Sequence, residues 1–187
     1  MRLCLTLFLI ACIPLMGYTQ PIQFTKDSIP IVDGKVVFSV NFEYDLDKEE
    51  FHKRAFAYLN NTLDPYSGKF HLNNDDYTVS RITDYLVIDE SFFQTLGMYM
   101  TYTLQLEYKD GSCMMVIRDI TYMEKGYFEA QEASKRKLNM PTYSGKDIMI
   151  DEKYALMLTK NTSERITDES LKRINEIIKT LDVSFAK

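Results

Sequence analysis

The sequence predicts an α+β fold: an antiparallel sheet with one helix from the N-terminal half of the chain and a C-terminal helix, both packed on one face. Residues 35–44 alternate apolar and polar side chains, and residues 98–122 form two alternating segments around a tight turn. Two amphipathic segments, near 47–61 and 167–182, have apolar side chains at helical spacing. The order of strand, helix, antiparallel strands and helix is typical of an α+β domain with its helices on one face.

The first strand and the helix that follows it are clearly marked. One face of the strand is apolar throughout: Val36, Phe38, Val40, Phe42 and Tyr44. Asp47 and Glu50 form a D-x-x-E variant of the capping box, and Leu46 begins a hydrophobic staple that Phe51 completes. The helix then has a single apolar stripe, which we expect to face the sheet: Phe51, Ala55, Tyr58 and Leu59.

The hairpin has the strongest local signal. Asp110-Gly111 predicts a two-residue type I′ turn, because both of its positions require a positive φ. Three pairs are expected on its dry face: Tyr108 with Cys113, Leu106 with Met115, and Leu104 with Ile117. Five pairs are expected on the other face: Glu107 with Met114, Gln105 with Val116, Thr103 with Arg118, Thr101 with Ile120, and Tyr99 with Tyr122. That mixture of polar and apolar side chains is unusual for a face that contacts only water.

The remaining segments are less regular. Residues 66–76 are expected to form a loop, and residues 77–88 a strand that Thr83-Asp84 divides in two. Within residues 123–165, a short helix is expected at about 128–137.

The C-terminal helix is expected to begin at Thr167, a good N-cap, and to end near residue 182. Its apolar stripe is Leu171, Ile174, Ile178 and Leu181. No internal repeat or linker divides the chain, so residues 20–187 are predicted to form a single domain.

Residues 1–19 are predicted to be a signal peptide that is cleaved before Gln20, because a short apolar run follows a basic N-terminus. The run is shorter than the ~20 residues of a membrane-spanning helix. The alternative is a lipoprotein signal, since Leu9-Ile10-Ala11-Cys12 has the order that lipoprotein processing uses. The apolar run continues beyond Cys12, which favours cleavage over a lipid anchor. Both interpretations predict export, to the periplasm or beyond.

Composition and charge exclude several classes of protein. The formal net charge of −5 becomes −6 when Arg2 leaves with the leader, and an acidic chain argues against a dedicated nucleic-acid binder. A hydrophobic share of 45% and an aromatic share of 13% exclude a disordered chain. Cys113 is the one cysteine that the predicted mature chain retains, so no intramolecular disulfide is expected.

Two stretches of sequence carry a family resemblance. The first is Ile31-Val32-Asp33-Gly34-Lys35-Val36-Val37-Phe38, followed by Lys48-Glu49-Glu50-Phe51 with Arg54-Ala55 and Tyr58. The second is the hairpin from Leu104 to Ile120, with Lys109-Asp110-Gly111 at its turn and Arg118-Asp119-Ile120 at its end. They resemble an uncharacterised family of exported bacterial domains with a fold like that of the TATA-binding protein (TBP-like). The resemblance covers about residues 29–122 and departs over 77–82 and 123–165. It implies a fold and no activity.

No pattern points to a metal, a cofactor or a catalytic centre. His52 and His71 belong to no metal-binding motif, and His52, beside an apolar helix stripe, is interpreted as structural. Cys113 lies on the predicted dry face, where a small core side chain is expected. The acidic pairs Asp75-Asp76 and Asp89-Glu90 lack the spaced ligands of a calcium loop. A hydrolase that uses carboxylates remains the least favoured alternative.

The candidate binding face is the mixed outer face of the hairpin: Tyr99, Met114, Val116, Arg118, Ile120 and Tyr122. The leading hypothesis is an exported, non-catalytic domain that binds a protein, a peptide or another envelope component through this surface. Alternatively, residues 123–165 cover the face. A second hypothesis is a small-molecule carrier with a pocket between sheet and helix, lined by Tyr102, Met100 and Phe42. Nucleic acid is not expected as a partner, because Arg118 is the one basic residue traced to this face.

Overall fold

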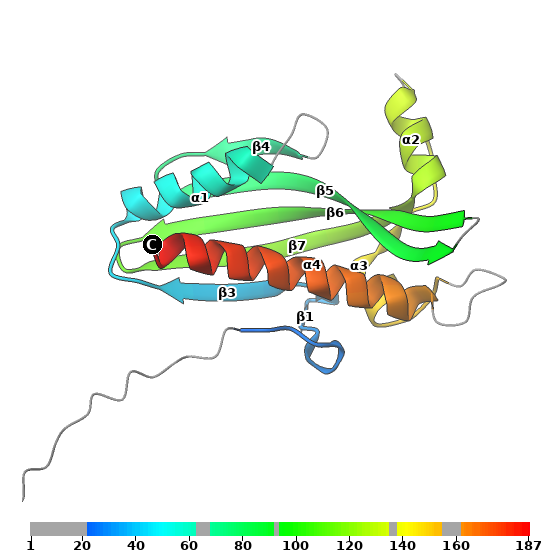
Figure 1. Cartoon of the computed structure of the whole chain (residues 1–187), viewed down its shortest axis with the longest axis horizontal. Helices are drawn as coiled ribbons and strands as arrows, with labels where there is room; N and C mark the ends of the chain where they lie inside the picture. The colour runs from blue at the N-terminus through cyan, green and yellow to red at the C-terminus, as the bar shows by residue number, and fades with distance from the viewer. Residues whose placement is uncertain (1–21, 63–67, 92–93, 135–137, 155–161) are drawn as a thin grey trace, which may run out of the picture.

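Figure 1 shows the computed structural model of the chain. The structure describes residues 22–62, 68–91, 94–134, 138–154 and 162–187. The predicted signal peptide, with Cys12, lies outside these residues. Among the helices of the described ranges, none is both long enough and apolar enough to cross a membrane.

The chain forms a six-stranded antiparallel sheet with helices. The helices are η1 (Lys26–Ser28), α1 (Lys48–Thr62), α2 (Lys125–Ala133), α3 (Gly145–Met149) and α4 (Thr162–Phe185). The strands are β1 (Ile31–Val32), β2 (Lys35–Val36), β3 (Phe38–Glu43), β4 (Gly68–Asn73), β5 (Tyr77–Ser91), β6 (Gln94–Lys109), β7 (Ser112–Glu124) and β8 (Tyr143–Ser144). The strand order is β3-β7-β6-β5-β4, with β8 paired to β7, while β1 and β2 form a separate ribbon.

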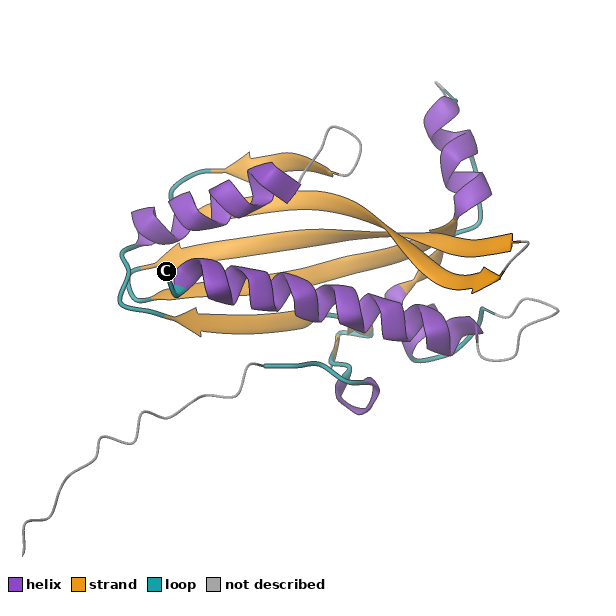
Figure 2. Ribbon diagram, viewed as in Figure 1, coloured by secondary structure: helices purple, strands orange, loops and turns teal. Residues whose placement is uncertain are grey.

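Helices α1 and α4 pack on the same face of the sheet, and α4 runs along it (Figure 2). The predicted α+β class, with both helices on one face, is therefore confirmed. We call the covered side of the sheet the inner face and the opposite side the outer face. The two faces differ because successive side chains of a strand point to opposite sides.

The core lies between the inner face and the two helices. Fully buried side chains come from every layer: Phe38 of β3, Phe51 of α1, Tyr102 and Leu104 of β6, Tyr122 and Met115 of β7, and Phe185 of α4. Where a buried side chain is polar, it has a partner in most cases, as in the hydroxyls of Tyr122 and Ser170, which lie 2.8 Å apart. The predicted dry face of the hairpin is thus the inner face.

Of the two hydrogen bonds of the predicted capping box at the start of α1, one is present and the other is replaced. The backbone N–H of Glu50 donates to Asp47 Oδ1 at 2.8 Å, so Asp47 caps the helix as predicted. The Glu50 side chain instead accepts from Arg54 Nε at 2.7 Å and from Lys53 Nζ at 3.1 Å. Nearby cations therefore hold this carboxylate along the helix, and they lower the pKa of Glu50.

Helix α4 begins earlier than predicted. Thr167, expected to be its N-cap, is buried inside the helix, where its hydroxyl donates to the carbonyl of Ser163 at 2.8 Å. Ser163 is buried too, and its hydroxyl donates to the carbonyl of Tyr154 at 2.8 Å. The first turn of α4 is thus stabilised by contact with Tyr154, nine residues before Ser163, and the preference of Thr167 for a cap position does not reveal this contact.

Two further segments differ from the prediction. The expected loop over residues 66–76 is wrong, because it contains strand β4, an edge strand whose side chains are mostly exposed. Phe70 and Leu72 alternate with polar neighbours, so a short strand signal was present in the sequence. Thr83-Asp84 does not divide the next segment, and β5 continues through it. The short helix expected at about 128–137 is present as α2, a few residues earlier in the chain.

The register of the hairpin holds as far as Thr103–Arg118 and then shifts by one residue. Asp119 has a φ of 54°, and the next aligned pair is Thr101 with Thr121 rather than Thr101 with Ile120. One extra residue in β7 is a β-bulge, and it reverses which face the following side chains point to.

Candidate functional site

The outer face of the sheet carries four of the six predicted binding residues. Tyr99, Met114, Val116 and Arg118 lie on it, and Met114 has 38% of its surface exposed. Their role in binding remains a prediction.

The prediction is wrong for the two residues beyond the bulge. Ile120 and Tyr122 are only 4% and 0% exposed, and both belong to the core on the inner face. Thr121 and Met123 take their places opposite Thr101 and Tyr99. The physical reason is the left-handed backbone of Asp119, which adds a residue to β7 and exchanges its two faces.

The outer face has apolar flanks on either side of a polar centre. Register aligns Met114 and Val116 of β7 with Glu107 and Gln105 of β6, which in turn face Tyr77 and Val79 of β5. Leu72 of β4 extends the row beyond Val79. We call the five apolar residues the outer-face patch: Leu72, Tyr77, Val79, Met114 and Val116. Leu72, Tyr77 and Met114 are its most exposed members.

A row of basic side chains borders this patch. Lys69 of β4, Arg81 of β5 and Arg118 of β7 lie in register with Thr103 of β6, and we call the three basic residues the basic row. Arg118 is paired with Asp119 at 3.0 Å. Within the described part of the chain, neither Lys69 nor Arg81 makes an ion pair. Two cations are thus available to an external anionic group.

The far end of the outer face is covered. The ring of Phe128, from α2, stacks on Tyr99 with a centroid separation of 4.0 Å, and Tyr99 in turn contacts the ring of Tyr85 at 5.0 Å. The Tyr85 ring also lies across Gly97, at the position that a Cβ would occupy. Of the two alternatives for this face, covering by residues 123–165 therefore applies at Tyr99, while the outer-face patch stays exposed.

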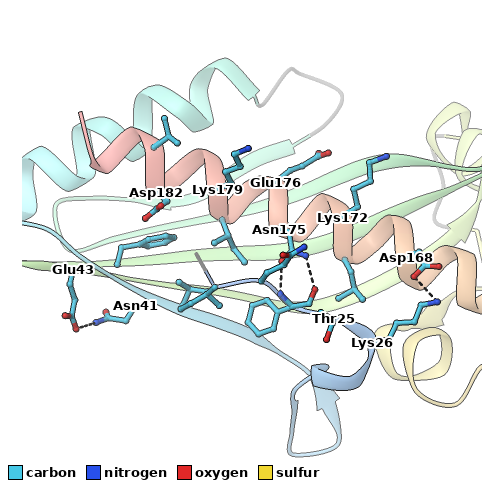
Figure 3. Close-up of a pocket in the computed structure, with 18 of the residues that line it drawn as sticks. Thr25, Lys26, Asn41, Glu43, Asp168, Lys172, Asn175, Glu176, Lys179 and Asp182 are labelled. Atoms are coloured by element: carbon cyan, nitrogen blue, oxygen red, sulfur yellow. Dashed lines mark hydrogen bonds and ion pairs between the residues drawn. The ribbon is translucent and has the colours of Figure 1, made fainter. Parts of the chain in front are cut away.

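A groove runs between α4, the edge strand β3 and the N-terminal segment (Figure 3). It has a volume of about 1380 Å³. Its apolar lining includes Val40, Phe42, Leu171 and Ile178. Of the three residues predicted to line a carrier pocket, Phe42 lies at this groove, whereas Met100 and Tyr102 are fully buried in the core.

A polar cluster on the inner face was not predicted. Asp84 of β5 accepts from Arg173 Nε at 2.8 Å and Nη2 at 3.2 Å, and from the Tyr102 hydroxyl at 2.8 Å. Burial, followed by the charge of Asp84, raises the pKa of Tyr102 well above its usual value. Every one of these groups has an oppositely charged or hydrogen-bonding partner, so the cluster has the character of a structural bridge between α4 and the sheet. The sequence offered one signal for it: the carboxylate of Asp84 stands between Ile82 and Leu86, which are buried on the same face of β5.

The other residues considered for chemistry are held by the fold. Cys113 is a free, buried cysteine, and burial raises the pKa of its thiol to about 12. His52 Nε2 lies 2.9 Å from Asn73 Oδ1, and its ring packs beside Tyr108, in keeping with a structural histidine. Asp76 is paired with Lys48 Nζ at 2.8 Å. Across the described ranges, no three His, Cys, Asp or Glu side chains group together as metal ligands.

Comparison with known proteins identifies the architecture. No protein-family model and no curated protein matches the sequence. A DUF4468 family protein from Bacteroides ovatus has the same fold, with a TM-score of 0.68 and 16% identity over 85% of this chain and 91% of that one. A TBP-like protein from Parabacteroides distasonis matches with a TM-score of 0.65 and 14% identity, over 85% of this chain and 97% of the other. The fold is TBP-like.

The TBP-like fold agrees with the family resemblance found in the sequence, and identities this low establish the fold alone. The descriptions of the two similar proteins state no activity and no ligand.

Proposed function

We propose that the protein is an exported, non-catalytic domain that binds a polypeptide partner of the cell envelope through the outer face of its sheet. The observation that carries the proposal is the exposed outer-face patch beside the basic row. An antiparallel sheet that met only water on this side would be expected to present mainly polar side chains. Leu72, Tyr77 and Met114 instead lie exposed on the same face as Lys69 and Arg81, two cations without acidic partners among the described residues.

The arrangement favours a polypeptide partner over other classes. Five strands at a spacing of about 4.8 Å give the face a width of roughly 19 Å, comparable with a helix of about 13 residues. The two apolar flanks suit apolar side chains of such a partner, and Gln105 between them offers hydrogen-bonding groups. Lys69 and Arg81 favour a partner with acidic side chains at one border.

Nucleic acid remains outside the proposal. A binder of the minor groove needs a broad basic surface and apolar wedges. The outer face carries acidic side chains among its basic ones: Glu107 is paired with Lys109 at 2.7 Å, and Asp119 with Arg118 at 3.0 Å.

Site-specific photocrosslinking in intact envelopes tests the proposal. Benzoylphenylalanine placed at Met114 should produce a discrete adduct with one polypeptide, whereas the same group at Val32, which is 53% exposed on the β1–β2 ribbon, should not. The adduct should weaken when Lys69 and Arg81 are both replaced by Glu, because the acidic partner would then be repelled. Absence of an adduct from both Met114 and Val116, or equal adducts from Val32, would refute the proposal. Ile120 is unsuitable for this test because it is buried.

Export is a separate element of the proposal. It is supported by the apolar leader and by Cys12 within it, both outside the described residues. N-terminal sequencing of the protein from its native host decides between Gln20, which indicates release, and a blocked, lipid-modified Cys12. An N-terminus that retains Met1 would argue against export.

A further inference from the structure

The groove beside β3 already holds one extended stretch of this chain. The backbone N–H of Phe24 donates to Asn175 Oδ1 at 2.9 Å, and Asn175 Nδ2 donates to the carbonyl of Phe24 at 2.9 Å. The Phe24 ring packs edge-on against Phe38 of β3, with a centroid separation of 4.9 Å. The side-chain amide of Asn175 therefore accepts from and donates to the backbone of one residue of the N-terminal segment, as the dashed lines in Figure 3 show. The ring of that residue packs on the apolar face of β3.

Beyond Phe38, the outer edge of β3 has unused backbone groups. The N–H of Val37 donates to the carbonyl of Pro30 at 3.2 Å, away from β7, and the N–H of Tyr44 donates to the carbonyl of Gly111 at 3.2 Å, on the β7 side. Both backbone groups of a residue in an antiparallel strand point to the same side, and the side alternates along the chain. The backbone groups of Ser39, Asn41 and Glu43 therefore point away from β7.

These groups have no backbone partner among the described residues. Such an edge is a template for a further strand. Because it offers donors and acceptors in alternation, an extended polypeptide is the ligand that matches it.

The walls of the groove set the length and the pattern of such a strand. Phe24 closes one end, and at the other the Tyr44 hydroxyl donates to Asp182 Oδ1 at 2.6 Å. From Phe38 to Tyr44 the edge is about 20 Å long at 3.4 Å per residue, which admits about five residues. The side chains on one side of an added strand would meet Val40, Phe42 and the apolar stripe of α4.

Charge contributes little to recognition in the groove. Lys26 is paired with Asp168 at 2.8 Å. The charges that line the groove nearly balance, because its three lysines are matched by four carboxylates: Lys26, Lys172 and Lys179 against Glu43, Asp168, Glu176 and Asp182. Backbone hydrogen bonds and the apolar floor are left as the main sources of affinity.

We propose that this groove is a second binding site, which accepts an extended segment of a partner polypeptide as a strand added to the free edge of β3, with an apolar side chain at every second position. The site lies one strand from the outer-face patch, because Asn41 pairs with Met114 in register, and its test does not depend on the proposed function.

Selection from a random heptapeptide library displayed on phage, against the chain from Gln20 to Lys187, tests the proposal. This chain contains every residue that the structure describes. Enriched peptides should alternate apolar and polar residues, and their affinity is measured by fluorescence anisotropy. Asn41→Pro removes an edge-facing N–H without removing a bond to β7, and it should weaken binding at least tenfold. The matched control Asn41→Ala keeps that N–H and should bind within twofold of the unaltered chain, as should Met114→Glu.

Methylated peptides keep the test decisive if Asn41→Pro fails to fold. N-methylation at the alternate positions that face β3 should abolish binding of the selected peptide, whereas N-methylation at the intervening positions should preserve it. Equal binding of both methylated forms overturns the proposal. A second result also overturns it: the protein binds no peptide and forms a dimer that Asn41→Pro dissociates. That result would assign the edge of β3 to a second copy of this chain. A small molecule retained in native mass spectrometry, with no peptide enrichment, would assign the groove to a carrier instead.

Discussion

Replacing Arg173 by Met tests the idea that the Asp84 cluster connects α4 to the sheet. Arg173 makes two hydrogen bonds to the Asp84 carboxylate, at 2.8 and 3.2 Å, and the two side chains are 25% and 17% exposed. The substitution removes the cation and leaves the Asp84 carboxylate mostly buried. Of its two partners in the cluster, the Tyr102 hydroxyl is then the one that still donates a hydrogen bond to it.

The expected cost follows from that geometry. Breaking a buried pair costs about 3–5 kcal/mol, and partial exposure of both groups lowers the figure to about 2–3 kcal/mol. For a domain of this size, each kcal/mol corresponds to a fall of about 2–4 °C in Tm. Arg173→Met should therefore lower the Tm by roughly 5–10 °C. Asp84→Asn should have a similar effect, and the double variant should reveal a coupling energy of about 2 kcal/mol.

Urea unfolding followed by circular dichroism measures these free energies. The matched control is Arg118→Met, which removes an arginine paired with Asp119 at 3.0 Å on the exposed outer face. Surface pairs contribute about 0–1 kcal/mol, so this variant should unfold within about 1 kcal/mol of the unaltered protein. Equal losses for Arg173→Met and Arg118→Met, or a coupling energy below about 0.5 kcal/mol, would refute the reasoning.

Three further predictions concern a buried thiol, a half-buried tyrosine and a close contact at a glycine. Burial raises the pKa of the Cys113 thiol to about 12, so a disulfide reagent at pH 8 should modify it no faster than the protein unfolds; immediate stoichiometric labelling would contradict its burial. Burial and the hydrogen bond to Asp182 raise the pKa of Tyr44 from 10.0 to about 12. The stability from this shift is complete below pH 10 and lost as the pH rises to 12, so Tyr44→Phe should flatten the fall in unfolding free energy over that window, and an unchanged slope in urea titrations would count against it. Gly97→Ala should displace the Tyr85 ring and cost about 1 kcal/mol, a loss that thermal unfolding should find largely absent when Tyr85 is already Ala.

Sequence patterns were sufficient wherever the structure follows local rules. The Asp110-Gly111 turn sets the pairing from Lys109–Ser112 to Thr103–Arg118 as predicted, because a two-residue loop fixes which residues face each other. The predicted type I′ geometry is wrong, since Gly111 has a φ of 81° but Asp110 does not have the positive φ that this turn type also requires. Asp47 caps α1 for an equally local reason, since its side chain reaches a free N–H three residues ahead.

Beyond the bulge at Asp119, the register predicted from the hairpin turn no longer holds. Its positive φ is a conformation that aspartate tolerates but that no turn motif announces. A signal was nevertheless present: the apolar residues of β7 recur every second position up to Ile117 and resume at Ile120, three positions on. A break of this kind indicates an extra residue in a strand, and reading it would have placed Ile120 and Tyr122 in the core.

By itself, the sequence determined the α+β class, the first strand, the cap of the first helix, the position and register of the hairpin turn, and the face on which α4 is apolar. These depend on backbone preferences and on side-chain periodicity within a few residues. Tertiary structure alone decided which edge of β3 is free, that Asp84 meets Arg173 across 89 positions, and that Leu72 and Tyr77 join Met114 on an exposed face. Those features arise from the order of strands in the sheet, which brings together residues whose separation along the chain leaves no local pattern to read.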